Sequence, residues 1–370
     1  LICIIEPLLN KSSMEVDVPG LKRVGRTIIA TGGVSTPGLE RLSNGDLLAS
    51  FRRLTPGLTG AGFSSWRGEV LRSRDGGLTW SDPILQINGK RPEDPDTMVP
   101  YYGMAQLDDG TILLPAMGPT RGTYMLRSTD NGVTWDGPEP AGQDIEGVDW
   151  SVLAPYGKIR KLSDGTVIFP VCGQFRGENT HVSGHLRSYD GGNTWTDFSA
   201  LARGHVFYND AIELPDGRMI AIIVNELSPS AHGMAPFYWT ESHDLGKTWS
   251  EPDFTTGAIY GNSPALFLTK NGTLLCGYRW TGDIDQGYVG VGISIFNDDG
   301  VGGGAWDSKP TMVWLGRGVM STYPGRSFSG YPAFSYADEE RILCAYFMSW
   351  MGSGDSVTQD IEGVYFIEED

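Results

Sequence analysis

The stretch that decides the fold is "SRDGGLTW", residues 73–80. Its pattern, S-x-D-x-G-x-T-W, returns as "STDNGVTW" at 128–135, "SYDGGNTW" at 188–195 and "SHDLGKTW" at 242–249. Successive copies begin 55, 60 and 54 residues apart, and a degenerate copy, "SIFNDDGVGGGAW", occupies 294–306. Self-similarity at a nearly constant period indicates a repeat architecture.

A second pattern runs in phase with the first. Apolar, β-rich segments flank a short turn that usually ends in Asp-Gly or Asn-Gly, which is the strongest short-range signal of a β-hairpin. Six such hairpins occur: "LERLSNGDLLASF", "MAQLDDGTILLPA", "IRKLSDGTVIFPV", "AIELPDGRMIAII", "LFLTKNGTLLCGY" and the Gly-less "AFSYADEERILCAYF". One hairpin, a third strand into the S-x-D-x-G-x-T-W turn and a fourth strand out of it make a four-stranded unit. Six units predict an all-β, six-bladed β-propeller with four antiparallel strands per blade, forming one domain over 1–370.

The repeated turns are typical of structural staples. Their Ser and Asp side chains can bond to nearby backbone, the Gly supplies a positive φ, and the Trp has a large area to bury. These turns resemble the Asp boxes, or BNR repeats, of the sialidase (neuraminidase) superfamily, whose members are six-bladed propellers. The resemblance covers nearly the whole chain and implies a glycosidase, although lyases and non-catalytic propellers share the box and a fold alone does not fix function.

The composition limits which classes of molecule the protein is expected to bind. A net charge of −17 argues against nucleic acid and an anionic membrane surface, since both require a basic field, and leaves carbohydrate as the expected partner. Of the four Cys, Cys276 and Cys344 occupy matching places in their hairpins, as small buried strand residues would, and we expect neither a disulfide framework nor a metal or other cofactor. No apolar run is long enough to cross a membrane. We expect a secreted or periplasmic protein, with a cytoplasmic one left open, and the oligomeric state stays undetermined. An N-terminal strand in "LICIIEPLL" (1–9) is expected to pair with "IEGVYFIEED" (361–370) and close the ring.

Strand order predicts which face carries chemistry. The hairpin turns and the S-x-D-x-G-x-T-W turns share one face, and the long loops between second and third strands gather on the other with the blade links. Loops on a rigid scaffold are where binding residues concentrate. On this second face we expect a sugar pocket in which aromatic rings stack on the sugar and polar groups bind its hydroxyls. The candidate binding residues are Arg52, Arg53, Arg279, Arg326, Asp149, Trp150, Tyr208, Tyr260 and Trp280.

The resemblance to sialidases implies particular roles. Tyr331, which opens the first strand of the sixth blade, matches the family's nucleophilic Tyr, a known exception to the paired carboxylates of glycosidases. Asp210 stands near the place of the activating Glu. Arg279 and Arg52 or Arg53 end second strands, where the family has pocket Arg residues, and Arg326 would complete a trio. The sequence also departs from the family: Ser35, in "VSTP", replaces the first Arg, no clear acid/base Asp precedes the first turn, and Glu226 lies where another Arg is expected.

Several functions remain open from the residues. The leading one is an exo-acting glycoside hydrolase with a non-standard sugar specificity, either through a Tyr nucleophile or through two of Asp149, Glu178, Asp210 and Glu226. A polysaccharide lyase acting on a uronate would use His205 or Tyr208 as its base. A true exo-α-sialidase with a rearranged Arg set and a non-catalytic glycan-binding propeller complete the alternatives.

Overall fold

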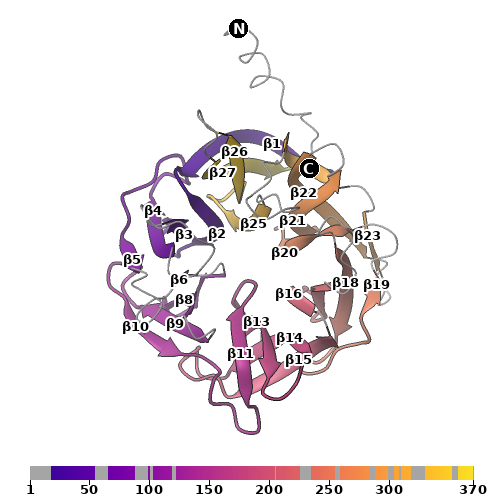
Figure 1. Ribbon diagram of the computed structural model, residues 1–370. Coiled ribbons are helices and arrows are strands. Elements are labelled where there is room, and N and C mark those ends of the chain that lie inside the picture. The colour runs from indigo at the N-terminus through magenta and orange to yellow at the C-terminus, as the bar shows by residue number, and fades with distance from the viewer. Residues whose placement is uncertain are drawn as a thin grey trace, which may run out of the picture.

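The computed structural model describes residues 18–54, 66–87, 99–100, 103–118, 122–204, 206–225, 235–254, 259–283, 288–298, 304–307, 310–317, 330–351 and 357–369. These residues form strands and turns, with no helix among them. The strands build antiparallel blades in a ring, which Figure 1 shows with β2, β16, β20 and β25 nearest its centre. The predicted six-bladed propeller is therefore confirmed.

The first three blades follow one another along the chain. Blade 1 comprises β2 (Val34–Arg41), β3 (Leu47–Leu54), β4 (Trp66–Ser73) and β5 (Leu85–Ile87). Blade 2 comprises β6 (Val99–Pro100), β7 (Ala105–Gln106), β8 (Ile112–Met117), β9 (Thr123–Ser128) and β10 (Asp136–Pro140). Blade 3 comprises β11 (Trp150–Pro155), β12 (Arg160–Lys161), β13 (Val167–Phe175), β14 (His181–Ser188) and β15 (Asp197–Gly204).

The other three blades complete the ring. Blade 4 comprises β16 (Val206–Glu213), β17 (Met219–Asn225), β18 (Ala235–Ser242) and β19 (Asp253–Phe254). Blade 5 comprises β20 (Tyr260–Leu268), β21 (Leu274–Asp283), β22 (Tyr288–Asp298), β23 (Gly304–Trp306) and β24 (Thr311–Arg317). A short ladder between β18 and β20 joins blades 4 and 5. Blade 6 comprises β25 (Gly330–Tyr336), β26 (Arg341–Met351), β27 (Val357–Glu368) and β1 (Leu21–Ala30).

Each blade contains its predicted hairpin. In blade 1 the amide of Leu42 donates to the carbonyl of Asp46 at 2.8 Å, and the equivalent bond recurs in the other five turns. Side chains of neighbouring turns then contact one another around one face: Arg41 pairs with Glu339 at 2.6 Å, and the amide of Ser163 donates to Glu213 at 2.8 Å. The hairpin turns therefore share one face, as strand order predicts.

The four S-x-D-x-G-x-T-W turns are built alike. In the first, the Ser73 hydroxyl donates to Asp75 at 2.7 Å and accepts from the amide of Gly77 at 2.8 Å, while the amide of Thr79 donates to Asp75 at 2.9 Å. Burial opposes ionisation of Asp75, but the bonds from Thr79 and Ser73 lower its pKa to about 2. The same set of bonds recurs around Asp130, Asp190 and Asp244. These side chains are occupied by their own turn, which makes the turn a structural unit. Of the degenerate fifth copy, the structure describes 294–298 and 304–306.

Arg side chains connect successive blades on this face. Arg187 of β14 donates to the carbonyl of Leu245 in the turn of the next blade at 2.9 Å. Arg72 and Arg127 make the same contact with the turns of blades 2 and 3, and the Tyr365 hydroxyl donates to Gly76 of blade 1 at 2.9 Å. Apolar clusters lie between blades rather than inside them. For example, Leu113 of blade 2 packs with Phe169 and Leu186 of blade 3. Burial of these faces is the main favourable term that holds the ring closed.

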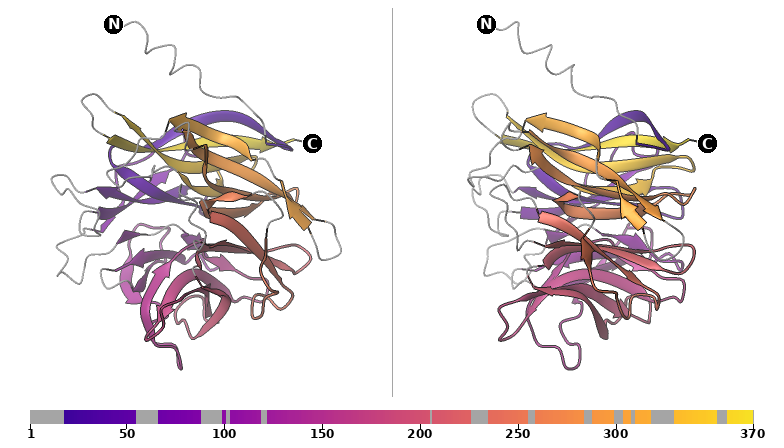
Figure 2. Two further views of the ribbon diagram at one scale, coloured as in Figure 1. Left: turned by 45° about the vertical axis from the view of Figure 1, so that its right-hand side comes forward. Right: turned by 90° about the vertical axis from the view of Figure 1, so that its right-hand side faces the viewer.

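The ring closes through the N-terminal strand, but with residues other than those predicted. The strand β1 pairs antiparallel with β27, from Leu21 opposite Glu368 to Ala30 opposite Ile361. Figure 2 shows the indigo strand lying along the yellow one. The predicted partner on the β27 side is thus confirmed, whereas "LICIIEPLL" lies outside the described residues. Sequence patterning could not choose between two apolar segments that precede blade 1.

Two further predictions concern the cysteines and membrane-spanning segments. Cys172, Cys276 and Cys344 are buried in strands, and no two of them are joined by a disulfide bond. In the part of the chain that the structure describes, no helix is long and apolar enough to cross a membrane.

Candidate active site

Tyr331 lies at an irregularity at the start of β25. The pairing of β25 with β26 shifts register between Gly330 and Ala333, and Tyr331 has a φ of +50°. Positive φ is unusual for a bulky residue and marks local strain. The fold therefore holds this side chain in a conformation that an ordinary strand residue would not adopt.

The same device occurs in two other blades. Thr36 in β2 and Ser263 in β20 both have a φ of +54°, both lie at a register shift, and both precede a Pro, as Tyr331 does. All three belong to first strands, which surround the centre of the ring (Figure 1). Because strained residues cluster at functional sites, this repeated bulge points to the centre of the ring as the site.

A hydroxyl pair forms the centre of this site. The Tyr331 hydroxyl lies 2.9 Å from the hydroxyl of Tyr208, which comes from β16 of blade 4. The Tyr208 ring also packs edge-on against Tyr156, with the centroids 4.6 Å apart. Segments from three different blades are thus brought together around one phenol.

Two cations accompany the pair. The guanidinium carbon of Arg279 lies 4.6 Å from the Tyr331 ring centroid, and Arg52 donates to the Ser35 hydroxyl at 2.9 Å and stacks on Trp66. Burial raises the pKa of Tyr331, but the charges of Arg279 and Arg52, with hydrogen bonds from Tyr208 and Ser263, outweigh burial and leave the pKa below its usual value. A phenol that ionises more readily than usual is a better nucleophile near neutral pH.

Arg279 also has hydrogen-bonding capacity to spare. Its Nε and Nη2 atoms are buried and have no hydrogen-bond partner among the described residues. Buried donors normally find a partner, so each exception needs an explanation. A carboxylate-bearing ligand above Tyr331 would supply that partner, because the planar guanidinium matches a carboxylate in geometry and charge.

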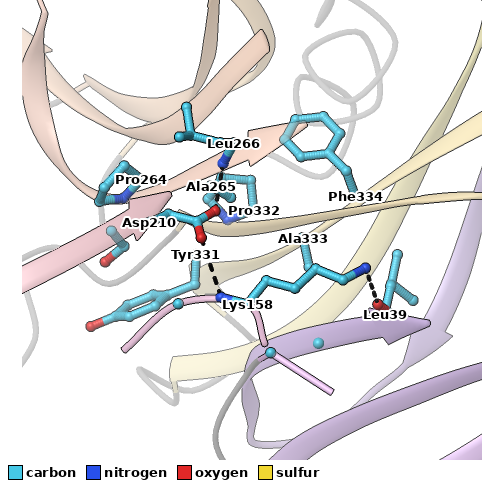
Figure 3. A pocket seen from close by; sticks show the side chains of 14 residues that line it. Leu39, Lys158, Asp210, Pro264, Ala265, Leu266, Tyr331, Pro332, Ala333 and Phe334 are labelled. Atoms are coloured by element: carbon cyan, nitrogen blue, oxygen red, sulfur yellow. Dashed lines mark hydrogen bonds between the residues drawn. The ribbon is translucent and has the colours of Figure 1, made fainter. Parts of the chain in front are cut away.

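A small central cavity continues beside Tyr331. Figure 3 shows Asp210, Lys158 and the Pro264 and Pro332 rings around it. Sequence analysis placed Asp210 as the partner of Tyr331. In the structure its carboxylate instead forms an ion pair with both terminal nitrogens of Arg160 and accepts from the amide of Leu266 at 2.8 Å. Only 1% of Asp210 is exposed, so its oxygens are occupied within the protein, and its observed role is to connect blades 3, 4 and 5.

Two other candidate acids, Asp149 and Glu178, form ion pairs on the surface. Asp149 accepts both bonds from Arg176 Nε at 3.0 Å, and Glu178 pairs with Arg203 at 3.4 Å, all four side chains being well exposed. Glu226 lies outside the described residues. The structure thus gives no support to a pair of carboxylates facing one sugar.

Of the other candidate residues, some are held by contacts within the protein and some lie outside the described residues. Arg53 donates to the buried Glu69 at 2.8 Å and to two backbone carbonyls, and Trp150 is buried against Phe175 and Phe198, which makes both of them structural. Trp280 packs against the core between blades 4 and 5. His205, Arg326 and the side chain of Tyr260 lie outside what the structure describes.

Sequence reasoning missed three residues of the site. Tyr156, Ser263 and Thr36 were not singled out, although a signal for two of them is present: "STP", "NSP" and "GYP" place a hydroxyl residue before Pro at the start of three first strands. Within the described residues no group of His, Cys, Asp and Glu has the arrangement of a metal site.

Comparisons with known proteins find similarity to sialidases. No family model matches the chain. It is 29% identical over 218 residues to a sialidase from Clostridium perfringens, covering 51% of this chain and 53% of that protein. It is also 25% identical over 303 residues to a sialidase from Paraclostridium sordellii, covering 73% and 70%. In sequence, the chain is thus similar to curated sialidases. It spans about half the length of the Clostridium relative.

Solved structures share the sialidase-like propeller. A protein of unknown function from Dyadobacter fermentans matches with a TM-score of 0.74 at 21% identity, over 95% of this chain and 100% of that one. The Hadza microbial sialidase Hz136 matches at 0.62 and 16% identity over 89% and 65%. An α-L-arabinanase from Penicillium chrysogenum, complexed with arabinobiose, matches at 0.57 and 17% over 92% and 98%. At these identities the likeness shows the fold, and the activity has to be argued from the site.

Proposed function

We propose that this sialidase-like propeller is an exo-acting glycoside hydrolase in which Tyr331 is the nucleophile. The observation that carries the proposal is the position of the Tyr331 phenol, which lies 2.9 Å from Tyr208 and under Arg279 in a strained conformation at the centre of the ring. Similarity to sialidases supports the reaction class, since a Tyr nucleophile is an established exception among glycosidases.

The substrate we propose is a terminal sugar that carries a carboxylate. Arg279 offers two unpartnered buried nitrogens, and Arg52 is fixed nearby by Ser35 and Trp66. Ser35 stands where the resemblance implies an Arg, so the carboxylate would be held by a different set of cations. We therefore expect a sugar specificity that differs from that of ordinary sialidases.

The reaction follows from the nucleophile. The Tyr331 oxygen forms a bond to the anomeric carbon while the bond from that carbon to the leaving oxygen breaks, and the leaving oxygen takes a proton from water. A second water then attacks the anomeric carbon, releases the sugar with its configuration retained and restores the phenolate, while the proton of that water goes to solvent. A negatively charged nucleophile suits this substrate only if the site neutralises the substrate carboxylate, which is the role proposed for Arg279.

Two other chemistries have less support. A paired-carboxylate mechanism needs two acids at one sugar, yet Asp210 is sealed by Arg160, and Asp149 and Glu178 form exposed ion pairs. A lyase would use His205 or Tyr208 as its base. His205 lies outside the described residues, and nothing in the geometry favours Tyr208 over Tyr331 for that role. We therefore keep the lyase and the non-catalytic propeller as outcomes of the test.

The test is turnover on a panel of aryl glycosides that includes sialic acid, uronic acid and neutral sugars. Wild type is compared with Tyr331→Phe and with Tyr189→Phe, a control at an exposed Tyr in a turn. We expect release from an acidic glycoside that is lost in Tyr331→Phe and kept in Tyr189→Phe. Release only from neutral sugars, or release that survives Tyr331→Phe, would contradict the proposal. So would an unsaturated product absorbing in the near ultraviolet, or binding without turnover.

A further inference from the structure

We propose that Tyr208 is a positioning residue that holds Tyr331 in its deprotonated form, so that a second phenol and two cations replace the activating carboxylate expected from the resemblance. This inference rests on the proposed function and deepens it, because it specifies how the nucleophile is made reactive. The carboxylate expected there, Asp210, belongs to the same strand as Tyr208 but is used elsewhere.

Geometry places Tyr208 in this role. Its hydroxyl is 2.9 Å from that of Tyr331, within hydrogen-bond distance, and the two rings meet edge-on with centroids 6.0 Å apart. Tyr156 packs edge-on against the other side of the Tyr208 ring. Tyr208 lies within the register shift of β16 between Val206 and Asn209, whereas Asp210 pairs regularly with Ile222. Because a strand rises about 3.4 Å per residue, Asp210 lies roughly 7 Å further along β16.

The charges around the pair have the sign that this mechanism needs. Arg279 of β21 lies over the Tyr331 ring, and Arg52 of β3 acts on the same phenol. From β20, Ser263 contributes a neutral hydroxyl, and from β26, Phe347 contributes an apolar ring. The acid and base that share the cavity with Tyr331 are each paired elsewhere: Asp210 with Arg160, and Lys158 with Glu40 at 2.8 Å. Two cations thus act on Tyr331.

This arrangement differs physically from activation by a carboxylate. A neighbouring carboxylate accepts the phenol proton during attack but disfavours a phenolate that forms before attack, since like charges repel. Two cations and a hydrogen-bond donor have the opposite effect and stabilise a phenolate that already exists before substrate binds. In the resting enzyme, Tyr208 therefore donates its proton to the Tyr331 oxygen and keeps that oxygen aimed.

The experiment is an absorbance titration of the Tyr residues in the ultraviolet, carried out on the full chain without substrate. Difference curves between wild type and Tyr331→Phe are expected to contain one phenol that ionises below the others. In Tyr208→Phe, which keeps the ring that packs on Tyr156, the ionisation of Tyr331 should move up by about one pH unit or more, since one unit corresponds to a tenfold change in proton affinity. Arg279→Met should move it in the same direction, and Tyr189→Phe, a change at an exposed Tyr in a turn, should leave the ionisation of Tyr331 where it is.

The outcomes separate this inference from the proposed function. An unchanged Tyr331 ionisation in a Tyr208→Phe variant that melts at the wild-type temperature would overturn the inference, even if the enzyme hydrolyses an acidic glycoside. The expected shift without any glycoside turnover would support the phenol pair and count against the hydrolase. When both hold, the rise of kcat/KM with pH should move upward in Tyr208→Phe by the same amount as the titration. If Tyr208→Phe melts early, the Arg279→Met titration decides, and no upward shift there would also overturn the inference.

Discussion

The face that carries the S-x-D-x-G-x-T-W turns (the turn face) and the centre of the ring are built from the same repeat, but their side chains differ in how they are bonded. On the turn face, four copies of one turn make the same bonds, and each Asp is occupied by its own Ser and Thr. At the centre, equivalent positions of three first strands carry Thr36, Ser263 and Tyr331 in strained backbone, and two nitrogens of Arg279 find no partner in the part of the chain that the structure describes. What recurs between blades is structural, and what differs between blades is where we place the chemistry.

The sharpest way to break this comparison is to remove one hydroxyl at the centre. Tyr331→Phe deletes the proposed nucleophile and should lower kcat by on the order of 10³-fold or more, as removal of a nucleophile commonly does. The ring and its packing on Phe347 remain, so the melting temperature should stay close to that of wild type. Steady-state kinetics and a thermal melt measure both. A variant that keeps most of its activity would move the chemistry away from the centre.

Asp210→Asn tests whether a carboxylate beside the cavity is structural. The substitution leaves Arg160 buried without its counter-charge, and breaking a buried pair in this way typically costs about 3–5 kcal/mol of stability. We expect a large loss in denaturant resistance with a kcat per folded molecule that is nearly unchanged. Chemical denaturation and active-site-normalised kinetics check this. A stable variant with abolished kcat would restore Asp210 to catalysis.

Two substitutions of Arg279 distinguish the effect of its charge from that of its planar shape. Arg279→Met should lower kcat/KM on an acidic glycoside by about 10- to 100-fold, because it removes both the cation over Tyr331 and the paired donors for the carboxylate. Arg279→Lys should recover only part of that loss, since a point charge cannot make the two-pronged contact. The pair of variants is compared by kinetics on one substrate. Equal activity of Met and Lys would show that the charge is unimportant.

Ser73→Ala tests the turn face, where we expect an effect on stability but not on activity. It leaves the buried amide of Gly77 without its acceptor and should destabilise the protein by about 1–2 kcal/mol. Activity of the folded protein should not change, because the turn lies on the face away from Tyr331. A melt and a kcat measurement are sufficient. A loss of kcat at full stability would mean that the turn face takes part in function.

The smallest expected effect is a loss of stability at acidic pH. Burial disfavours the charged form of Asp75 and Asp244, but bonds from Thr and Ser lower both pKa values to about 2 from an ordinary 3.8. Carboxylates with a lowered folded pKa stabilise the protein fully above the ordinary value and lose that contribution as the pH falls toward the folded value. We therefore expect the unfolding free energy to decline between about pH 4 and pH 2. In Asp75→Asn that decline should be shallower, and an identical slope would contradict the assignment.

Repetition explains why the fold could be predicted and the site only in part. Six copies of a hairpin and four copies of a turn fix the period, the blade number and the strand order, whatever any single residue does. Tyr331, Arg279, Arg52 and Tyr208 could be singled out because they stand at strand ends of a recognisable blade.

Asp210 was expected beside Tyr331 because sequence spacing does not reveal the bulge that brings Tyr208 to that place. Trp150 and Arg53 were expected in the pocket because the sequence does not show that Trp150 packs on neighbouring rings or that Arg53 pairs with Glu69. The extent of the domain and the roles of Glu226, His205 and Arg326 stay predictions.

The measurement that tests the central claim most directly is peptide mass spectrometry after rapid acid quenching of turnover on the best aryl glycoside from the panel. A Tyr nucleophile predicts that the sugar is attached to the peptide containing Tyr331, and that Tyr331→Phe has no such adduct. Sugar attached to a peptide without Tyr331, or a product of inverted configuration with no adduct, would contradict the account.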